Sequence, residues 1–81
     1  MKVAAVKSCA QSFSIEEIEA AIEGVVEREE LALPIEGDNL GEKLTHLLLA
    51  QRIHARMATG ESFKDAFRAL MAEVRGTLIN E

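Results

Sequence analysis

The residues best suited to chemistry are concentrated in one stretch, residues 39–58, which reads NLGEKLTHLLLAQRIHARMA. It contains both histidines of the chain, His46 and His54, whose side chains change charge near neutral pH. On a helix they lie about 80° apart, so both could face one groove. Glu42 precedes His46 by one turn, and this pair could supply two metal ligands. Because helical metal sites take further ligands from a second helix, and no third histidine exists, we expect no metal site.

Arg52 and Arg56 are one helical turn apart and, with Thr45, form the one polar sector of this stretch. Two arginines at this spacing could hold a phosphate or a carboxylate. The simpler interpretation is that they pair with glutamates of the acidic segment that precedes them in the chain. With His46 nearby, the arginines are the candidate residues for binding a small anionic ligand.

Gln51 is the polar exception on an apolar stripe. It lies among Leu44, Leu47, Leu48 and Ala55 on the helical wheel. A buried amide left without a partner costs about 1–3 kcal/mol, so Gln51 should have one. A second copy of Gln51 across a two-fold axis would supply it, as a polar residue fixes register in coiled coils.

No recognised catalytic signature appears in the chain. Cys9 is the only cysteine, and it has neither a Cys-x-x-Cys partner nor a histidine in its local sequence. There is no glycine-rich phosphate loop and no H-E-x-x-H motif. We therefore expect a protein that is not an enzyme and requires no cofactor. The single cysteine also favours a reducing compartment, and we expect the cytoplasm.

Residues 39–58 have the features of a central helix. Asn39 and Glu42 form an N-terminal capping signal, and Gly60 follows the last turn. Apolar residues occupy most of the circumference of this helix, which is typical of a helix buried on several sides. We therefore expect neighbouring helices on nearly every side of it, with Leu47, Leu48 and Ile53 all buried.

The rest of the chain supplies helices to pack against this one. Ser14 and Glu17 make an S-x-x-E capping box, and Ser62 with Asp65 begins the last helix. Pro34 lies in a connector, residues 31–38, whose apolar residues alternate. The N-terminal spacing favours a short helix, although a strand remains an alternative. The expected fold is all-α, a small helical bundle of three main helices over 14–30, 39–58 and 62–79, plus a short N-terminal helix over 3–12.

Length and charge restrict the functional classes. The 81 residues form one domain, residues 1–81, and a core this small often needs oligomerisation for stability. The net charge is −5, with ten acidic against three basic residues up to residue 42 and six basic against four acidic residues after it. An acidic chain argues against non-specific nucleic-acid binding. No apolar segment is long enough for a membrane helix. A homodimer is the expected state.

Two motifs carry a resemblance to other proteins. GEKLTH occupies residues 41–46, and SFKDAFRAL occupies residues 62–70. With these motifs the chain resembles short uncharacterised bacterial helical proteins that have a G-E-x-L-T-H helix start and an F-x-x-A-x-R last helix. The resemblance covers about residues 14–79. It implies a helix-start and packing role for residues 41–46 and no particular activity.

The expected function is therefore that of a non-enzymatic, homodimeric protein–protein interaction module. The alternative is a small-anion or ligand-binding protein that uses the Arg52, Arg56 and His46 region. DNA binding as a dimer is a third and weaker reading, because the last helix offers few basic residues and the chain is acidic. The candidate interface or ligand residues are Glu42, His46, Gln51, Arg52, His54 and Arg56.

Overall fold

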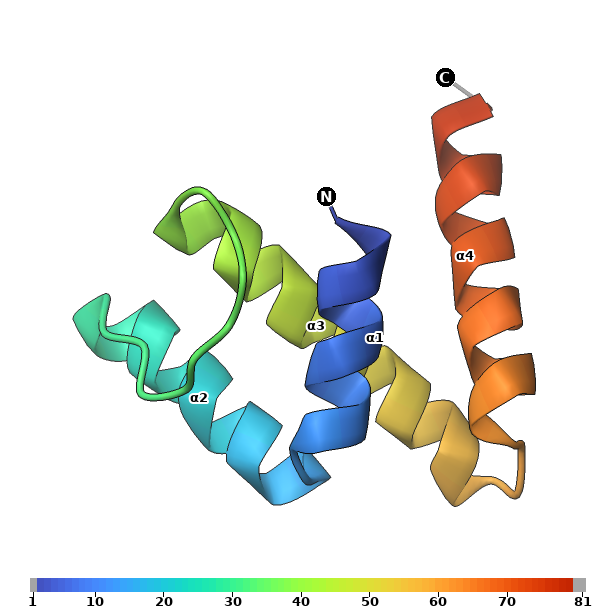
Figure 1. The fold of residues 1–81 in the computed structure, drawn as a ribbon, viewed down its shortest axis with the longest axis horizontal. Helices are drawn as coiled ribbons and strands as arrows, with labels where there is room; N and C mark the ends of the chain where they lie inside the picture. The colour runs from blue at the N-terminus through green and yellow to red at the C-terminus, as the bar shows by residue number, and fades with distance from the viewer. Residues whose placement is uncertain (1, 80–81) are drawn as a thin grey trace.

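The computed structural model describes the backbone of residues 2–79 and the side chains of residues 2–75. Within the described backbone the fold is all-α, with helices and no strand. The helices are α1 (Val3–Ser12), α2 (Ile15–Arg28), α3 (Leu40–Ala58) and α4 (Phe63–Ile79) (Figure 1). Each begins and ends within two residues of the range expected from the sequence. The N-terminal segment is a helix, so the strand alternative is wrong.

The helices begin where the sequence predicts caps. In α2 the Glu17 backbone N–H donates to Ser14 Oγ at 3.2 Å, and the Ser14 backbone N–H donates to Glu17 Oε1 at 2.9 Å. Asn39 caps α3 and Ser62 caps α4 in the same way, each accepting from the backbone N–H three residues later. These bonds satisfy donors that the first helical turn leaves free, so the predicted helix starts are confirmed.

α3 is the helix on which the others pack. α1, α2 and α4 each contact it. Figure 1 shows α1 crossing α3, α2 beside it, and α4 rising from its C-terminal end. The buried core draws on all four helices and the connector: Val6, Cys9, Ala10, Ile18, Ala21, Val25, Ile35, Leu47, Ala50, Ile53, Ala66 and Leu70.

One sector of α3 departs from expectation. Leu47 and Ile53 are completely buried, as predicted, but Leu48 is 41 % exposed and Ala55 is also exposed. Leu48 lies about 200° around the helix from His46, which contacts the start of α1. It therefore points away from α1, into a sector that no described helix covers. The expectation of neighbours on nearly every side is wrong for this sector.

The connector between α2 and α3 keeps the predicted alternation. Ile35 is buried and Leu31 and Leu33 are half-buried, while Ala32 and Pro34 are exposed. The Ile35 backbone N–H donates to the Leu33 carbonyl at 2.9 Å, so the chain turns tightly at Pro34. The connector therefore covers part of the core. Among the described residues, no helix combines the length and apolarity needed to cross a membrane.

The capping box gives a direct test of the fold. Ser14→Ala should lower the free energy of unfolding by about 0.5–2 kcal/mol, because the Glu17 N–H loses its acceptor. Urea unfolding followed by circular dichroism measures this change. Ser8→Ala, at an exposed position within α1, is the control and should cause no loss, since alanine is the better helix former. Equal losses in the two variants would contradict the role of the cap.

Candidate functional site

An uncovered apolar surface lies across α2 and α3, and we call it the α2–α3 face. On α2 it follows Ile15, Glu19, Ile22 and Val26, and on α3 it follows Leu44, Leu48, Gln51 and Ala55. In each helix the positions are three or four apart, so they share one side. Val26 is 67 % exposed and Leu48 is 41 % exposed. The face is therefore apolar along its length and open to solvent.

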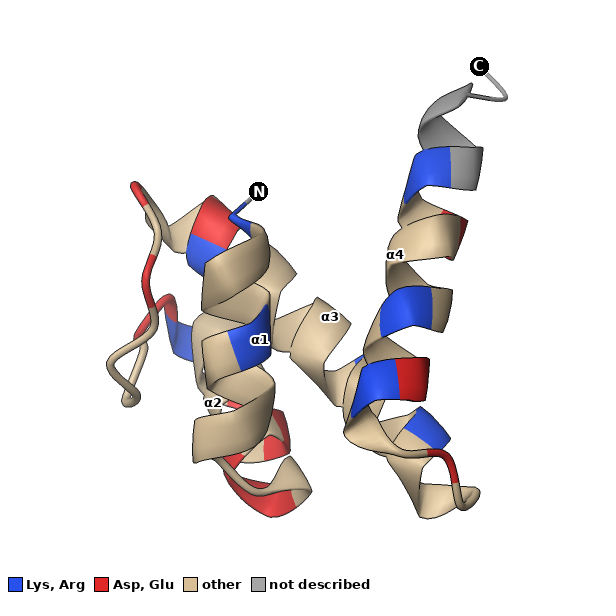
Figure 2. Ribbon diagram, turned by 45° about the vertical axis from the view of Figure 1, so that its right-hand side comes forward, with Lys and Arg blue, Asp and Glu red and all other residues tan. Residues whose placement is uncertain are grey.

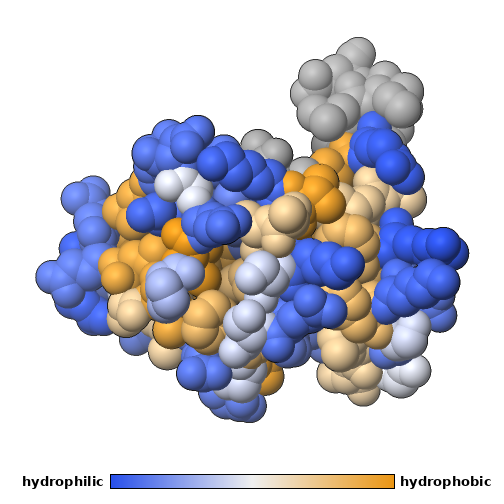
Figure 3. All heavy atoms as spheres, viewed as in Figure 1, coloured by the Kyte–Doolittle hydropathy of each residue, from blue (hydrophilic) through white to orange (hydrophobic). Residues whose placement is uncertain are grey.

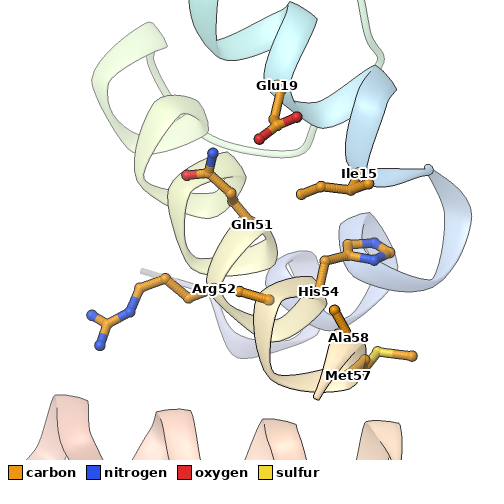
Figure 4. Close-up of a pocket in the computed structure, with 8 residues that line it drawn as sticks. Ile15, Glu19, Gln51, Arg52, His54, Met57 and Ala58 are labelled. Atoms are coloured by element: carbon orange, nitrogen blue, oxygen red, sulfur yellow. The ribbon is translucent and has the colours of Figure 1, made fainter. Parts of the chain in front are cut away.

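A hollow of about 570 Å³ lies at one end of this face. Ile15 and Glu19 line it from α2, and Gln51, His54 and Ala55 line it from α3, together with other residues of the last two turns of α3. In Figure 4 the side chains of Glu19 and Gln51 extend toward one another, while Arg52 points away from α2. No hydrogen bond joins the Gln51 amide to the described residues. Gln51 is only half-buried, so the structure places it at the edge of the open face and not inside the core.

Arg52 and Arg56 pair with α4. Both guanidinium groups bind the Glu73 carboxylate, Arg56 at 2.8 Å, and Arg56 also binds Glu61 at 3.1 Å. The hydrogen bond from Arg56 lowers the pKa of Glu73, and the Arg52 charge adds to this effect. The hydrogen bonds that Arg56 donates to Glu73 and Glu61 raise the pKa of Arg56. The two arginines and the two glutamates therefore form a local, charge-balanced cluster.

The expectation that these arginines pair with α2 is wrong. α4 lies along the side of α3 that carries Arg52 and Arg56, whereas α2 lies along the opposite side, near Gln51. Figure 2 shows the acidic residues of α2 well separated from the basic residues along α4. The guanidinium groups consequently meet Glu61 and Glu73, which come from the same half of the chain.

His46 is completely buried and uses both ring nitrogens. Its Nε2 lies 3.0 Å from the backbone nitrogen of Lys2, and its Nδ1 lies 2.8 Å from the carbonyl oxygen of Glu36. A backbone N–H can only donate, so Nε2 must accept, and Nδ1 must carry the proton that it donates to Glu36. The bonding pattern therefore requires a neutral ring with its proton on Nδ1.

His54 binds the other end of α1. Its Nε2 donates to the carbonyl oxygen of Phe13, the residue that follows α1, at 3.0 Å. The two histidines therefore hold opposite ends of one helix and do not share a groove. The amino-acid sequence alone did not predict that the two histidines hold the ends of α1. The available signal was their spacing of eight residues, about 12 Å along α3, which nearly matches the roughly 15 Å length of α1.

Glu42 acts at the start of α3. Its carboxylate accepts the Asp38 backbone N–H at 2.7 Å, and this bond lowers the pKa of Glu42. Lys2 forms an ion pair with Asp38 at 3.3 Å, which ties the start of α1 to the same region. Among the described residues, no cluster of three metal-ligating side chains occurs. The structure thus uses Glu42 and His46 to organise the start of α3 and the attachment of α1.

The candidate residues fall into three separate places. His46 and Glu42 lie near the start of α1 and the connector, Arg52 and Arg56 face α4, and Gln51 lines the α2–α3 face. The structure therefore does not bring His46 together with the two arginines. The α2–α3 face combines exposed apolar side chains, a hollow and polar groups at its rim.

A family model covers nearly the whole chain. The model of a family described as "Family of unknown function (DUF6952)" matches residues 1–79. Neither the curated proteins nor the solved structures gave a match.

The buried thiol should be unreactive. Burial raises the pKa of Cys9 from 9.0 to about 11, so at about pH 8 the folded protein holds about a hundredfold less thiolate than the unfolded chain. We expect a disulfide reagent such as DTNB to label the native protein far more slowly than the same protein in urea. Similar labelling rates in the two states would show that α1 does not protect Cys9.

Glu73 should stabilise the fold in a pH-dependent way. Its pKa is lowered from 4.5, so its pairs with the arginines contribute fully above about pH 4.5 and are lost as the pH falls through the lowered value. Glu73→Gln should reduce the melting temperature at pH 7, and this difference should shrink in acid. Glu23→Gln, at an exposed position on α2, is the control. A Glu73→Gln difference that persists unchanged in acid would contradict the pairing.

Proposed function

The chain belongs to this family of unknown function, and from this premise we propose that it is a non-enzymatic protein–protein interaction module that acts as a homodimer. The observation that carries the proposal is the exposed apolar character of the α2–α3 face. Leu48 lies near its centre and Val26 at its edge, and both are large apolar side chains in contact with water. Covering such side chains is favourable by about 25 cal/mol for each Å² buried.

The dimensions of the molecule suit a two-fold interface. The principal extents are 31 × 31 × 19 Å, so the chain forms a slab. α2 and α3 run for about 21 Å and about 28 Å, because a helix rises about 1.5 Å per residue. Two such helices side by side offer an area close to the roughly 800 Å² per partner of a standard interface. A slab that buries one broad face would also gain the additional stability that a small core needs.

The pattern of residues on α3 favours a second copy as the partner. Its uncovered positions follow a heptad-like spacing of three and four: Gly41, Leu44, Leu48, Gln51, Ala55 and Ala58. This spacing is typical of a helix that pairs with another helix. Gln51 is the single polar member and has no hydrogen-bond partner among the described residues. A copy of the same seam would bring a second amide close to it, which supports the two-fold arrangement suggested by the sequence.

Charge favours one orientation of the two copies. Glu19 borders the seam on the α2 side, and Arg52 borders it on the α4 side. A two-fold axis parallel to α3 would place Glu19 of one copy against Arg52 of the other. An axis across α3 would place the acidic α2 helices against each other, where like charges repel. We therefore propose a parallel arrangement of the two α3 helices.

Anion binding is the weaker proposal. Arg52 and Arg56 are already bound to Glu73, and His46 is buried near the other end of α3. A phosphate at the arginines would have to displace the Glu73 carboxylate, which lies 2.8 Å from Arg56. The geometry therefore favours the interaction module.

The decisive variant is Leu48→Glu, which places a charge at the centre of the α2–α3 face. We expect the wild-type chain to sediment as a dimer at micromolar concentration and the variant to sediment as a folded monomer. Val3→Glu is the matched control, because Val3 is 45 % exposed on α1, on the other side of α3. Val3 belongs to the α1 side of the molecule, where apolar and charged side chains mix (Figure 3). The Val3→Glu variant should therefore remain a dimer.

Two results would overturn this proposal. A wild-type chain that is a strict monomer would exclude the homodimer, and its stabilisation by phosphate in a thermal-shift assay would favour the anion site. Equal loss of the dimer in Leu48→Glu and Val3→Glu would show that the interface lies elsewhere. Circular dichroism of each variant establishes that it is folded.

A further inference from the structure

We propose that His46 makes the attachment of α1 to α3 sensitive to pH, so that uptake of a proton by its ring releases the start of α1. The inference is independent of the proposed dimer, because it concerns the opposite side of α3. It depends on the hydrogen bonds of one buried ring and on the place of Lys2 in the first turn of α1.

The first step is the direction of the hydrogen bonds. The Lys2 backbone N–H points at Nε2 of His46 across 3.0 Å, and only a neutral ring offers a lone pair there. A protonated ring carries hydrogen on both nitrogens. Two N–H groups would then face each other at this distance, and the ring is 0 % exposed, so water cannot separate them without movement of the chain. The native contact and the charged ring are mutually exclusive.

The second step is the position of Lys2, the residue at the N-cap of α1. Its carbonyl oxygen accepts the first two helical hydrogen bonds, from the N–H groups of Ala5 at 3.0 Å and Val6 at 3.2 Å. The Lys2 side chain forms no capping bond with the helix. His46 therefore holds Lys2 in place through the Lys2 N–H, and Lys2 holds the first turn of α1 through its carbonyl oxygen. Loss of the His46 bond removes support from the whole first turn.

The third step is that the other contacts of this end of α1 are weak: the Lys2–Asp38 ion pair is exposed to solvent, and the apolar contacts are small. The buried residues of α1 are small: Ala5, Val6, Cys9 and Ala10. Small side chains bury little apolar area, so local opening of such a helix requires less free energy than opening of the larger core. The bond from His54 to Phe13 survives protonation, because its Nε2 donates in both charge states. Release should therefore begin at the N-terminal end and leave the C-terminal end attached.

The charged groups around His46 do not provide an alternative acceptor. The elements that contact its ring are the start of α1 and the connector. The titratable and charged groups on these elements and on the adjacent turn of α3 are Lys2, Lys7, Cys9, Glu36, Asp38, Glu42 and Lys43, and the charge of the amino terminus also acts on Glu42. Asp38 pairs with the Lys2 ammonium, and Glu42 accepts the Asp38 N–H, so both carboxylates are engaged. Among the described residues, the hydrogen-bond partner of Nε2 is the Lys2 N–H.

Hydrogen exchange on the full chain tests the proposal. Between about pH 7.5 and about pH 5, the range in which histidine changes charge, the protection factors of the Ala5 and Val6 amides should fall by about tenfold or more. The amides within α2 and α3 should keep their protection, which distinguishes local release from global unfolding.

The key variant is His46→Gln, whose amide oxygen can accept the Lys2 N–H and does not titrate in this range. It should keep α1 protected at both pH values. His54→Gln is the matched control and should retain the pH dependence. Unchanged protection of Ala5 and Val6 in the wild type, or a loss in His46→Gln equal to that of the wild type, would overturn the proposal. If His46→Gln does not fold, the wild type alone still tests the proposal. A His46 ring that NMR shows to take up a proton, while the Ala5 and Val6 amides keep their protection, would overturn it.

Discussion

The structure depends on the division of a single helix surface among three neighbours. α1, α2 and α4 all pack on α3, and a helix has room for only a few neighbours around its circumference. α1 takes the side of His46, α2 takes the side of Gln51, and α4 takes the side of Arg56. The sector around Leu48 is left without a neighbour. Both the buried core and the exposed α2–α3 face follow from this division.

The three neighbours are held by different forces. α4 combines apolar contacts through Ala66 and Leu70 with the exposed ion pairs of Glu73, which salt screens. The buried side chains of α1 are small, and its ends are fixed by two imidazoles, of which His46 accepts the Lys2 N–H and His54 donates to the Phe13 carbonyl. Because these bonds go to the backbone, they position the ends of α1 whatever its side chains are. Salt should therefore weaken chiefly the attachment of α4, whose Glu73 pairs are also lost in acid, whereas proton uptake by His46 should act on α1.

Local features of the fold could be predicted from the sequence, whereas the packing partners could not. The caps at Ser14 and Asn39 were predictable because both partners lie within three residues. The pairing of Arg56 with Glu73 was not, because it depends on which side of α3 each neighbour occupies, and both α2 and α4 carry glutamates. For the same reason the wheel of α3 identified its apolar positions but could not show that Leu48 would be the one left uncovered. The burial of His46 between two backbone groups depends on the path of the connector, which no local pattern encodes.

The two proposed properties occupy opposite sides of α3, and this separation has a physical consequence. Leu48 is about 200° around the helix from His46, so removing the start of α1 changes no contact made by the α2–α3 face. α3 itself keeps Leu47 and Ile53 buried against its other neighbours. A dimer formed through the α2–α3 face would therefore persist while α1 opens, and each copy would then expose a second apolar surface, pointing away from the dimer axis. Because Val6 and Cys9 cover that surface only in the closed form, opening of α1 changes what the dimer presents to a partner without changing its assembly.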